Sequence, residues 1–203
     1  MICFFCDYLC NIVDFVAKEG KPSFDNAKIF NEIIQKMDES GGTIYIPTGD
    51  FYIDTPIEID RSYVSVVGEN SGLRSGVDSG NNKSQSGGGG SRLIARPNVT
   101  VFRIEDKDNQ DRISGLTFSN FQIYGQSNNG IGIEGVQDTD RVVVDEVVIN
   151  NVGIGIKLNG ADSISLKKSW ISETASSVIL SGASQQANIS NNAFVASFID
   201  SRL

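Results

Sequence analysis

The sequence has 203 residues, of which 39% are hydrophobic and 21% charged, with a formal net charge of −8 and no histidine. The length suits one folding unit. The lack of histidine excludes Ser-His-Asp and Cys-His nucleophilic sites and HExxH zinc sites, so any catalysis must use carboxylates, Lys, Tyr or a bound ion. The negative charge argues against a nucleic acid or an anionic membrane surface as the partner. No apolar run approaches the roughly 18 to 20 residues of a membrane-spanning helix.

The first ten residues, MICFFCDYLC, contain all three cysteines of the chain. Neither a histidine nor a second cysteine pair completes a tetrahedral site, so we expect no metal and no cofactor. The segment also lacks the positive start and the small-residue cleavage site of a secretory signal, which leaves cytoplasm and secretion both open. We interpret residues 1–10 as an apolar, Cys-rich leader in front of a single domain, residues 11–203, which disulfides do not hold together.

Residues 11–67 are predicted to form a cap and the first strands of the domain. The segment 23–40, SFDNAKIFNEIIQKMDES, places its apolar residues at helical spacing, with Ser23 or Asp25 as the N-cap. The glycine pair at 41–42 is expected to end this helix. Short strands with alternating apolar residues follow in TIYIP, TGDFYI, IEID and YVSVVG.

A long loop and then a periodic region make up the rest of the chain. Residues 68–91 are rich in Gly, Ser and Asn and predict the loop. Residues 92–203 contain four similar strand–turn–strand segments, ISGLTFSNFQI, VVVDEVVI, ISLKKSWI and NISNNAFV, and a second class of strand, GIGIEG, GIGIKLNG and SVILSG, lies between them. The last apolar residues of the four segments recur at intervals of 26, 22 and 24, at Ile123, Ile149, Ile171 and Val195.

A fixed period in the low twenties, built from short strands with Gly and Asn between them, indicates a solenoid. We therefore predict an all-β fold, a right-handed parallel β-helix with an N-terminal capping helix, and keep an antiparallel sandwich as the alternative. Asparagines are expected at the corners, where the backbone turns through left-handed conformations; these are Asn150, Asn151, Asn191 and Asn192. Inward side chains are expected to stack along the axis; these are Val142, Val144, Ile164, Leu166 and Ile189.

Two stretches carry a resemblance to known families. NIVDFVAKEGKPSFDNAKIFNEII and GGTIYIPTGDFYI resemble the N-terminal cap of pectate-lyase-like β-helix proteins, although Val16 stands where those proteins usually have glycine. From about Ile44 to Ala196 the chain is similar to the inulin fructotransferases (inulin lyases) and the related difructose dianhydride hydrolases. The match runs through ISGLTFSNFQIYG and continues without gaps from Gly132 to Ala183.

The resemblance implies trimeric enzymes that cleave β-2,1 linkages of inulin without water and release a difructose dianhydride. It also implies two catalytic carboxylates, an Asp and a Glu eleven residues apart on one rung, which act as acid and base. In this chain those positions fall on Lys168 and Ile179. Isoleucine cannot carry a proton, and lysine acts as a base only if its pKa is strongly lowered. The catalytic residues are therefore unassigned, with Asp162 and Glu173 as substitutes in the same rung.

Other candidate residues are polar or aromatic side chains on the rungs. The densest acidic set is Asp138, Asp140, Asp145 and Glu146. Of these, Asp145 and Glu146 are candidate substrate-binding residues, as is Trp170, whose ring could stack on a sugar. The alternatives are solvated corner residues for the acids and a core or subunit contact for the tryptophan. The lysine pair Lys167 and Lys168 could contact an anionic polysaccharide or simply be solvated.

We expect the protein to act on or bind an oligo- or polysaccharide, with fructan as the first choice and a homotrimer as its assembly. The alternatives are a non-catalytic carbohydrate-binding or assembly module, from a truncated or degenerate family member, and a pectate-lyase-like depolymerase of another polysaccharide. Proteins of the resembled family are about twice as long. With a cap, the first strands and about four rungs, the chain is expected to be truncated at its C-terminus.

Overall fold

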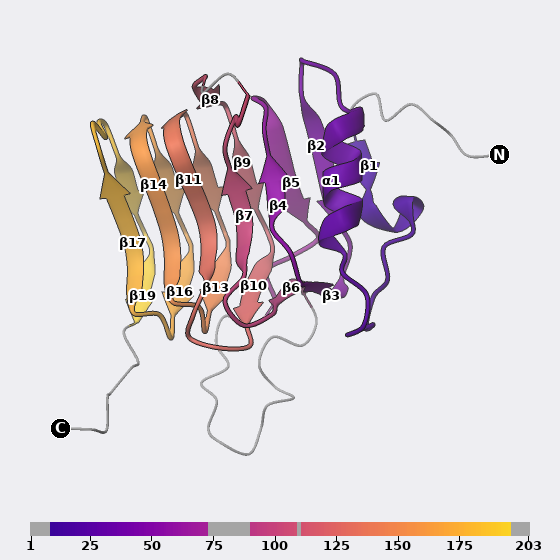
Figure 1. Ribbon diagram of the computed structural model, residues 1–203. Helices are drawn as coiled ribbons and strands as arrows, with labels where there is room; N and C mark the ends of the chain where they lie inside the picture. Colours follow the sequence, from indigo (N-terminus) through magenta and orange to yellow (C-terminus); the bar gives the residue numbers. More distant parts are fainter. Residues whose placement is uncertain (1–8, 73–89, 109–110, 196–203) are drawn as a thin grey trace.

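The computed structural model describes residues 9–72, 90–108 and 111–195. Three parallel β-sheets surround a single apolar core, and the chain coils around it, adding one strand to each sheet per turn (Figure 1). The expectation of an all-β solenoid with parallel sheets is confirmed, and the antiparallel sandwich is wrong. No helix in the described part of the chain is long and apolar enough to cross a membrane.

Each sheet has one strand from each successive coil. The first sheet contains β1 (Leu9–Asn11), β2 (Gly42–Ile46), β5 (Val64–Gly68), β9 (Thr117–Ser119), β12 (Val143–Asp145), β15 (Ser165–Lys167) and β18 (Asn188–Ser190). The second contains β3 (Gly49–Ile53), β6 (Ser91–Ala95), β10 (Gln122–Gly125), β13 (Val148–Asn150), β16 (Trp170–Ser172) and β19 (Ala193–Val195). The third contains β4 (Ile57–Ile59), β7 (Thr100–Ile104), β11 (Ile131–Asp140), β14 (Ile154–Asp162) and β17 (Ser176–Ser181), and the short β8 (Ile113–Ser114) pairs with the end of β11.

The helix α1 (Ala27–Lys36) lies at the N-terminal end of the solenoid, after the 3-10 helix η1 (Ile12–Phe15), and buries one face in the core (Figure 1). It is shorter than the predicted segment 23–40. The N-cap position is Asn26, which makes no side-chain capping bond, so Ser23 is not the cap. The capping contact comes from Asp25, as one of the two predictions had it, because its carboxylate accepts from Ala27 N at 3.1 Å and also from Asp54 N at 2.9 Å. At the other end, the backbone is already extended at Met37, before the glycine pair.

The described part of the fold begins inside the segment that we interpreted as a leader. β1 pairs with β2, and Cys10 is buried and disulfide-bonded. The expectation that residues 1–10 precede the fold is therefore wrong for Leu9 and Cys10, which belong to β1. Of the predicted loop 68–91, Gly68 ends β5 and Ser91 begins β6, while residues 73–89 lie outside the described residues.

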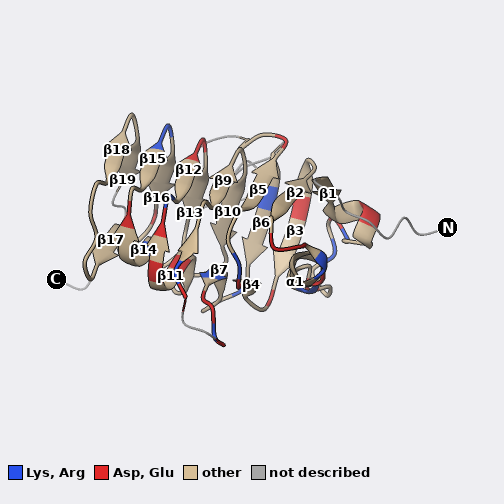
Figure 2. Ribbon diagram, turned by 90° about the horizontal axis from the view of Figure 1, so that it is seen from above, with Lys and Arg blue, Asp and Glu red and all other residues tan. Residues whose placement is uncertain are grey.

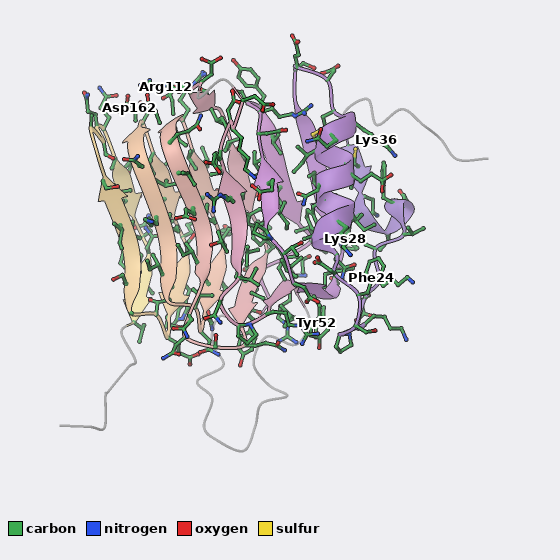
Figure 3. All side chains as sticks on the ribbon, in the orientation of Figure 1. Phe24, Lys28, Lys36, Tyr52, Arg112 and Asp162 are labelled. Carbon is green, nitrogen blue, oxygen red and sulfur yellow. The ribbon has the colours of Figure 1, made fainter. Side chains whose placement is uncertain are left out.

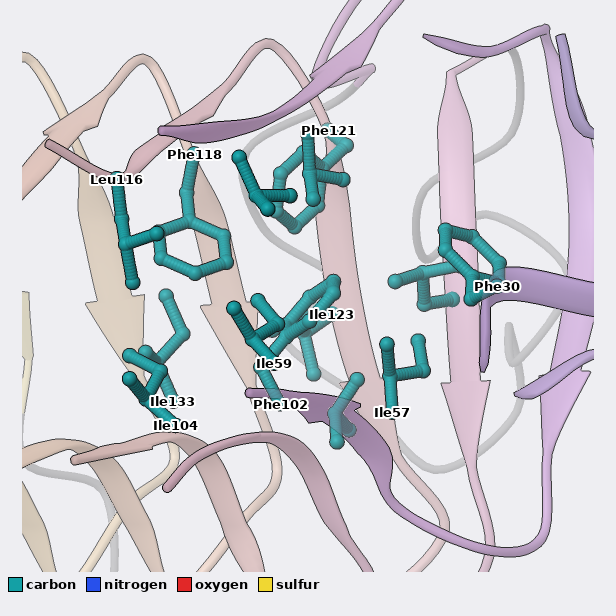
Figure 4. Close-up of a cluster of buried hydrophobic side chains, with 14 of the residues drawn as sticks. Phe30, Ile57, Ile59, Phe102, Ile104, Leu116, Phe118, Phe121, Ile123 and Ile133 are labelled. Atoms are coloured by element: carbon teal, nitrogen blue, oxygen red, sulfur yellow. The ribbon is translucent and has the colours of Figure 1, made fainter. Parts of the chain in front are cut away.

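Inward-facing side chains of the three sheets meet in the core, where Phe102 packs against Phe30, Phe118 and Phe121 (Figure 4). The predicted inward stack is confirmed for four residues, which are buried: Val142, Val144, Ile164 and Leu166. The fifth, Ile189, aligns with Leu166 but is 42% exposed, because it lies on the last coil that the structure describes.

One of the predicted intervals is wrong by one residue. In the second sheet Ile123 pairs with Ile149 and Ile149 with Ile171, which confirms the steps of 26 and 22. Ile171 then pairs with Phe194 rather than Val195, so the last step is 23. Alternation along a strand makes Phe194 the inward residue, whereas the sequence comparison had selected the last apolar residue of its segment.

Single residues in the left-handed conformation form the corners between sheets. Between the first and second sheets these are Asn120, Glu146, Lys168 and Asn191, with φ between 56° and 59° except for 50° at Lys168. Asn151, with φ of 55°, follows β13 in the same way. The expectation of left-handed asparagine corners is confirmed for Asn151 and Asn191, but Asn150 lies inside β13, and Asn192 bonds through its side chain to Ser169 N and Leu166 O.

Replacing Val16 by glycine is expected to raise the free energy of unfolding by about 1 kcal/mol. Val16 has φ of 65° and a side chain that is 67% exposed, so the β-branched residue is strained and buries little. Removing the strain of an L-residue in the left-handed conformation stabilises the folded state by roughly 1–2 kcal/mol. Glycine offsets roughly 0.5–1 kcal/mol of this gain, because it increases the entropy of the unfolded chain. Denaturant unfolding measures the change. Val13→Gly is the control, an exposed η1 residue with negative φ, and should lose stability; equal losses in both variants would contradict the prediction.

Candidate functional site

The corner between the first and second sheets carries four of the predicted residues, and the structure joins them into ion pairs. Asp145 Oδ2 lies 3.3 Å from Lys167 Nζ, and Glu146 Oε1 lies 3.0 Å from Lys168 Nζ. Each acid is paired with the lysine 22 residues further on, which is its neighbour on the next coil. The two predicted substrate-binding carboxylates therefore already have cationic partners.

The surroundings of Lys168 raise its pKa, whereas a lysine that acts as a base needs a lowered pKa. The Glu146 carboxylate accepts its hydrogen bond and, together with the charge of Asp145, raises the pKa of Lys168. A raised pKa keeps the ammonium protonated at neutral pH, whereas a general base must be free of its proton. The Lys168 side chain is therefore held as a cation at this corner.

Lys168 and Ile179 lie on opposite sides of the solenoid. Lys168 is at the corner between the first and second sheets, whereas Ile179 is in β17 of the third sheet (Figure 2). Its neighbours Val178 and Leu180 pack against the core, so the side chain of Ile179 points outward, beside Lys157 of β14. The core separates the two positions, and side chains there cannot act on one sugar linkage within a single chain.

The substitute pair, Asp162 and Glu173, is also divided. Asp162 ends β14, whereas Glu173 precedes β17 at the opposite edge of the same sheet. The six residues of β17 alone span about 20 Å at the rise of a β-strand. Paired glycosidase carboxylates are about 5–9.5 Å apart, so these two acids cannot form such a pair in one chain.

Asp162 instead belongs to a group of acids and arginines at the carboxyl end of the third sheet (Figure 3). Arg112 Nη2 lies 2.6 Å from Asp138 Oδ2 and 3.2 Å from Asp162 Oδ2. Beside them, Arg141 Nε lies 3.1 Å from Asp140 Oδ2. The acidic set predicted from the sequence is thus split between two corners, and at each one cations neutralise it.

Trp170 lies on neither of these corners but on the outer face of the second sheet, where it is partly exposed. Its strand neighbour Ile171 is the core residue, so the interpretation of Trp170 as a core side chain is wrong. Two further aromatic residues, Tyr52 and Tyr124, face outward on the same sheet, and the Arg92 guanidinium lies 5.8 Å from the centre of the Tyr124 ring. Neither tyrosine was among the predicted site residues, although alternation along their strands identifies both as outward-facing.

The described residues contain no group of three or more His, Cys, Asp or Glu side chains that could hold a metal ion. Their outer surface presents charged corners, neutralised by ion pairs, and one face with partly exposed aromatic side chains above buried amides. Such surfaces suit a neutral, hydroxyl-rich ligand better than an ion.

Comparisons with known proteins agree with the resemblance seen in the sequence. No protein-family model matches the chain. An inulin fructotransferase (DFA-I-forming) from Arthrobacter globiformis is 24% identical over 208 aligned positions, which cover 87% of this chain and 52% of that protein. The chain thus spans about half the length of the curated relative that it matches. The similarity to the inulin fructotransferase family is confirmed, at modest identity.

Solved structures give the same fold. DFA-IIIase from Arthrobacter chlorophenolicus A6 in complex with GF2 superimposes with a TM-score of 0.77 at 21% identity, over 95% of this chain and 53% of that one. The same enzyme in complex with DFA-III gives a TM-score of 0.72 at 20% identity, over 92% and 51%. The ORF18 protein of Geobacillus virus E2 gives 0.55 at 17% identity, over 92% and 40%. These likenesses establish the β-helix fold of the described coils.

Proposed function

We propose that this chain binds fructan and does not itself convert it to a difructose dianhydride. Similarity to an inulin fructotransferase along most of the chain, and the shared fold of a DFA-IIIase crystallised with GF2, support fructan as the ligand. The observation that carries the second half of the proposal is the pair Lys168 and Ile179, which stand at the expected carboxylate positions and on opposite sides of the solenoid.

The chemistry of glycosyl transfer supports the same proposal. Cleavage needs one group that protonates the leaving oxygen and a carboxylate that assists the nucleophile, both at the same linkage. Lys168 is held protonated by Glu146, and Asp162 is bound by Arg112. The acids near the expected site therefore stabilise neighbouring cations instead of facing one another.

The test combines calorimetry with product analysis. Titration with inulin and with GF2 is expected to release heat of binding, and long incubation with concentrated protein should give no difructose dianhydride on chromatography. An inulin fructotransferase processed in parallel shows that the assay detects product. Release of the dianhydride would indicate an active carboxylate pair elsewhere and overturn the absence of turnover, whereas the lack of binding would overturn fructan as the ligand.

The alternative of a depolymerase for acidic polysaccharides has less support. It would use Lys168 to contact uronate, but the charge of that ammonium group is already compensated by the Glu146 carboxylate at 3.0 Å. Pectate and alginate in the same incubation provide the check, because unsaturated products absorb in the ultraviolet. Their appearance would favour this alternative over fructan.

Three structural features belong to the same proposal. We infer that α1 caps the N-terminal end, since its apolar face packs into the core there (Figure 1), and that the coil is right-handed. We also keep the homotrimer implied by the resemblance as a proposal. The molar mass of the protein in solution, measured by light scattering, distinguishes a trimer from a single chain of 21.9 kDa.

A further inference from the structure

The outer face of the second sheet differs from the other faces of the solenoid. Its outward residues form two columns along the axis, one residue per strand. The first column is Asp50, Arg92, Gln122, Val148, Trp170 and Ala193. The second is Tyr52, Ile94, Tyr124, Asn150, Ser172 and Val195. The outward column on the third sheet is charged and joined by ion pairs such as Lys157–Glu134, whereas the outer face of the second sheet combines amides with aromatic rings.

The two amide side chains on this face are buried and have no hydrogen-bond partner in the described part of the chain. Gln122 and Asn150 are both 0% exposed, and neither amide nitrogen or oxygen has a hydrogen-bond partner among the described residues. The hydroxyl of Ser172, beside Asn150 on the next strand, is buried and unmatched in the same way within the described part of the chain. Buried polar groups in native proteins are nearly always paired, and each exception costs about 1–3 kcal/mol.

Packing alone does not require amides at these positions. Val148 stands between Gln122 and Trp170 in the same column, is buried, and has no polar atom to satisfy. An apolar side chain at either amide position would avoid the cost. The amides therefore indicate a hydrogen-bonding ligand, since each offers a donor and an acceptor in one plane, which match a sugar hydroxyl.

The aromatic side chains stand where such a ligand would meet the face. Tyr124 is in register with Asn150 and two residues from Gln122, and Trp170 is in register with Val148. Both are partly exposed. Their rings can pack against the C–H groups of a sugar at positions next to the two amides. Arg92 is held at one end of the face by Asp50, at 2.7 Å and 2.6 Å.

We propose that the outer face of the second sheet is the surface on which this chain binds fructan, with Gln122, Asn150 and Ser172 as hydrogen-bonding residues and Tyr124 and Trp170 as stacking residues. The inference rests on the proposed function, because it names the site of that binding. The three polar residues lie on three neighbouring strands, β10, β13 and β16, so the ligand lies along the solenoid axis (Figure 2).

Trp170 provides a direct probe, because it is the single tryptophan of the chain. GF2 is titrated while its binding heat and the tryptophan emission are recorded. The double variant Gln122→Met, Asn150→Leu keeps the shape of both side chains without their polar atoms. We expect GF2 to shift the emission of the wild-type chain, and the double variant to bind at least about tenfold more weakly while its stability is retained or increased. The control is Asn159→Leu, an exposed amide on the third sheet, which should bind as the wild type does.

The outcomes separate this inference from the proposed function. Heat of binding together with unchanged emission, or equal affinity in the double variant and the wild type, overturns this face and leaves fructan binding in place. The absence of any binding heat overturns both. Should the double variant fail to fold, the emission of the wild-type chain on its own decides, because a ligand on this face must alter the surroundings of Trp170.

Discussion

Replacing Phe102 by alanine is expected to lower the free energy of unfolding by about 3–5 kcal/mol, the largest single effect that we predict for this chain. The Phe102 ring is fully buried, and its centre lies 5.0 Å from that of Phe118, 5.8 Å from Phe121 and 6.5 Å from Phe30. Phe118 lies in β9 of the first sheet, Phe121 in the corner just before β10 and Phe30 in α1, so the ring of Phe102 connects the third sheet to the first sheet, to that corner and to the helix. Its removal leaves a cavity that several elements border and none can fill alone (Figure 4).

Denaturant unfolding followed by circular dichroism measures the loss. Phe194→Ala is the matched control, since Phe194 is also inward but 46% exposed on the last described coil, and should lose much less. Phe102→Leu, which leaves a smaller cavity, provides an intermediate value if the alanine variant does not fold. Equal losses in Phe102→Ala and Phe194→Ala would show that the aromatic cluster does not hold the layers together.

Replacing Asn26 by leucine is expected to lower the free energy of unfolding by about 2–4 kcal/mol, although the two side chains are nearly the same size. Asn26 is fully buried; its Oδ1 accepts from Lys18 N at 2.8 Å, and its Nδ2 donates to Lys18 O and Tyr52 O at 3.3 Å and 3.2 Å. Leucine would remove the side-chain partners of Lys18 N and Lys18 O, at roughly 1–3 kcal/mol for each that stays buried, while Tyr52 O keeps its bond from Asn26 N. The segment before α1 would keep its contacts with β3 through Asn26 N and Gly20 N, so the loss falls on the turn that contains Lys18.

The aspartate variant refines the interpretation. Asn26→Asp keeps the acceptor for Lys18 N but places a carboxylate against two carbonyl oxygens. We therefore expect it to lower the free energy of unfolding at least as much as Asn26→Leu does. The loss should become smaller in acid, where the carboxyl group is protonated. Asn159→Leu, at an exposed asparagine, is the control for the loss of an amide. The absence of any difference between Asn26→Leu and this control would contradict the role of Asn26 in holding the turn that contains Lys18.

The solenoid could be predicted because its signals repeat. Each coil sets the same apolar residues at the same place, so Ile123, Ile149 and Ile171 identify the inward column without knowledge of the rest. The same period contains the pairing of Glu146 with Lys168, 22 residues apart, which the sequence analysis had considered separately. Signals that occur once were harder to interpret: Ser23 and Asp25 are both good N-caps, and only the bond from Ala27 N to the Asp25 carboxylate decides between them.

The candidate site could be predicted only in part. Sequence comparison indicates that Lys168 and Ile179 replace carboxylates, but not that the core lies between them, since this depends on which sheet each strand joins. Trp170 was selected for its chemistry, whereas Gln122 and Asn150 were not, because an amide on a strand is ordinary until its burial and its lack of partners are known. Burial of a polar group is a property of the packed sheet and has no local sequence signal.

The parallel ladders also determine how this protein can change in length. Loss or gain of one residue in a strand such as β12 or β13 would turn its inward side chains outward and mismatch the ladders on both sides. A whole turn of the solenoid, by contrast, begins and ends at equivalent corners. Arg141 and Ser163 are two such corner residues, with φ of 51° and 53°. Residues 142–163 therefore form one complete turn of 22 residues. This is the smallest segment that could be duplicated or deleted while every neighbouring strand still has a strand to pair with.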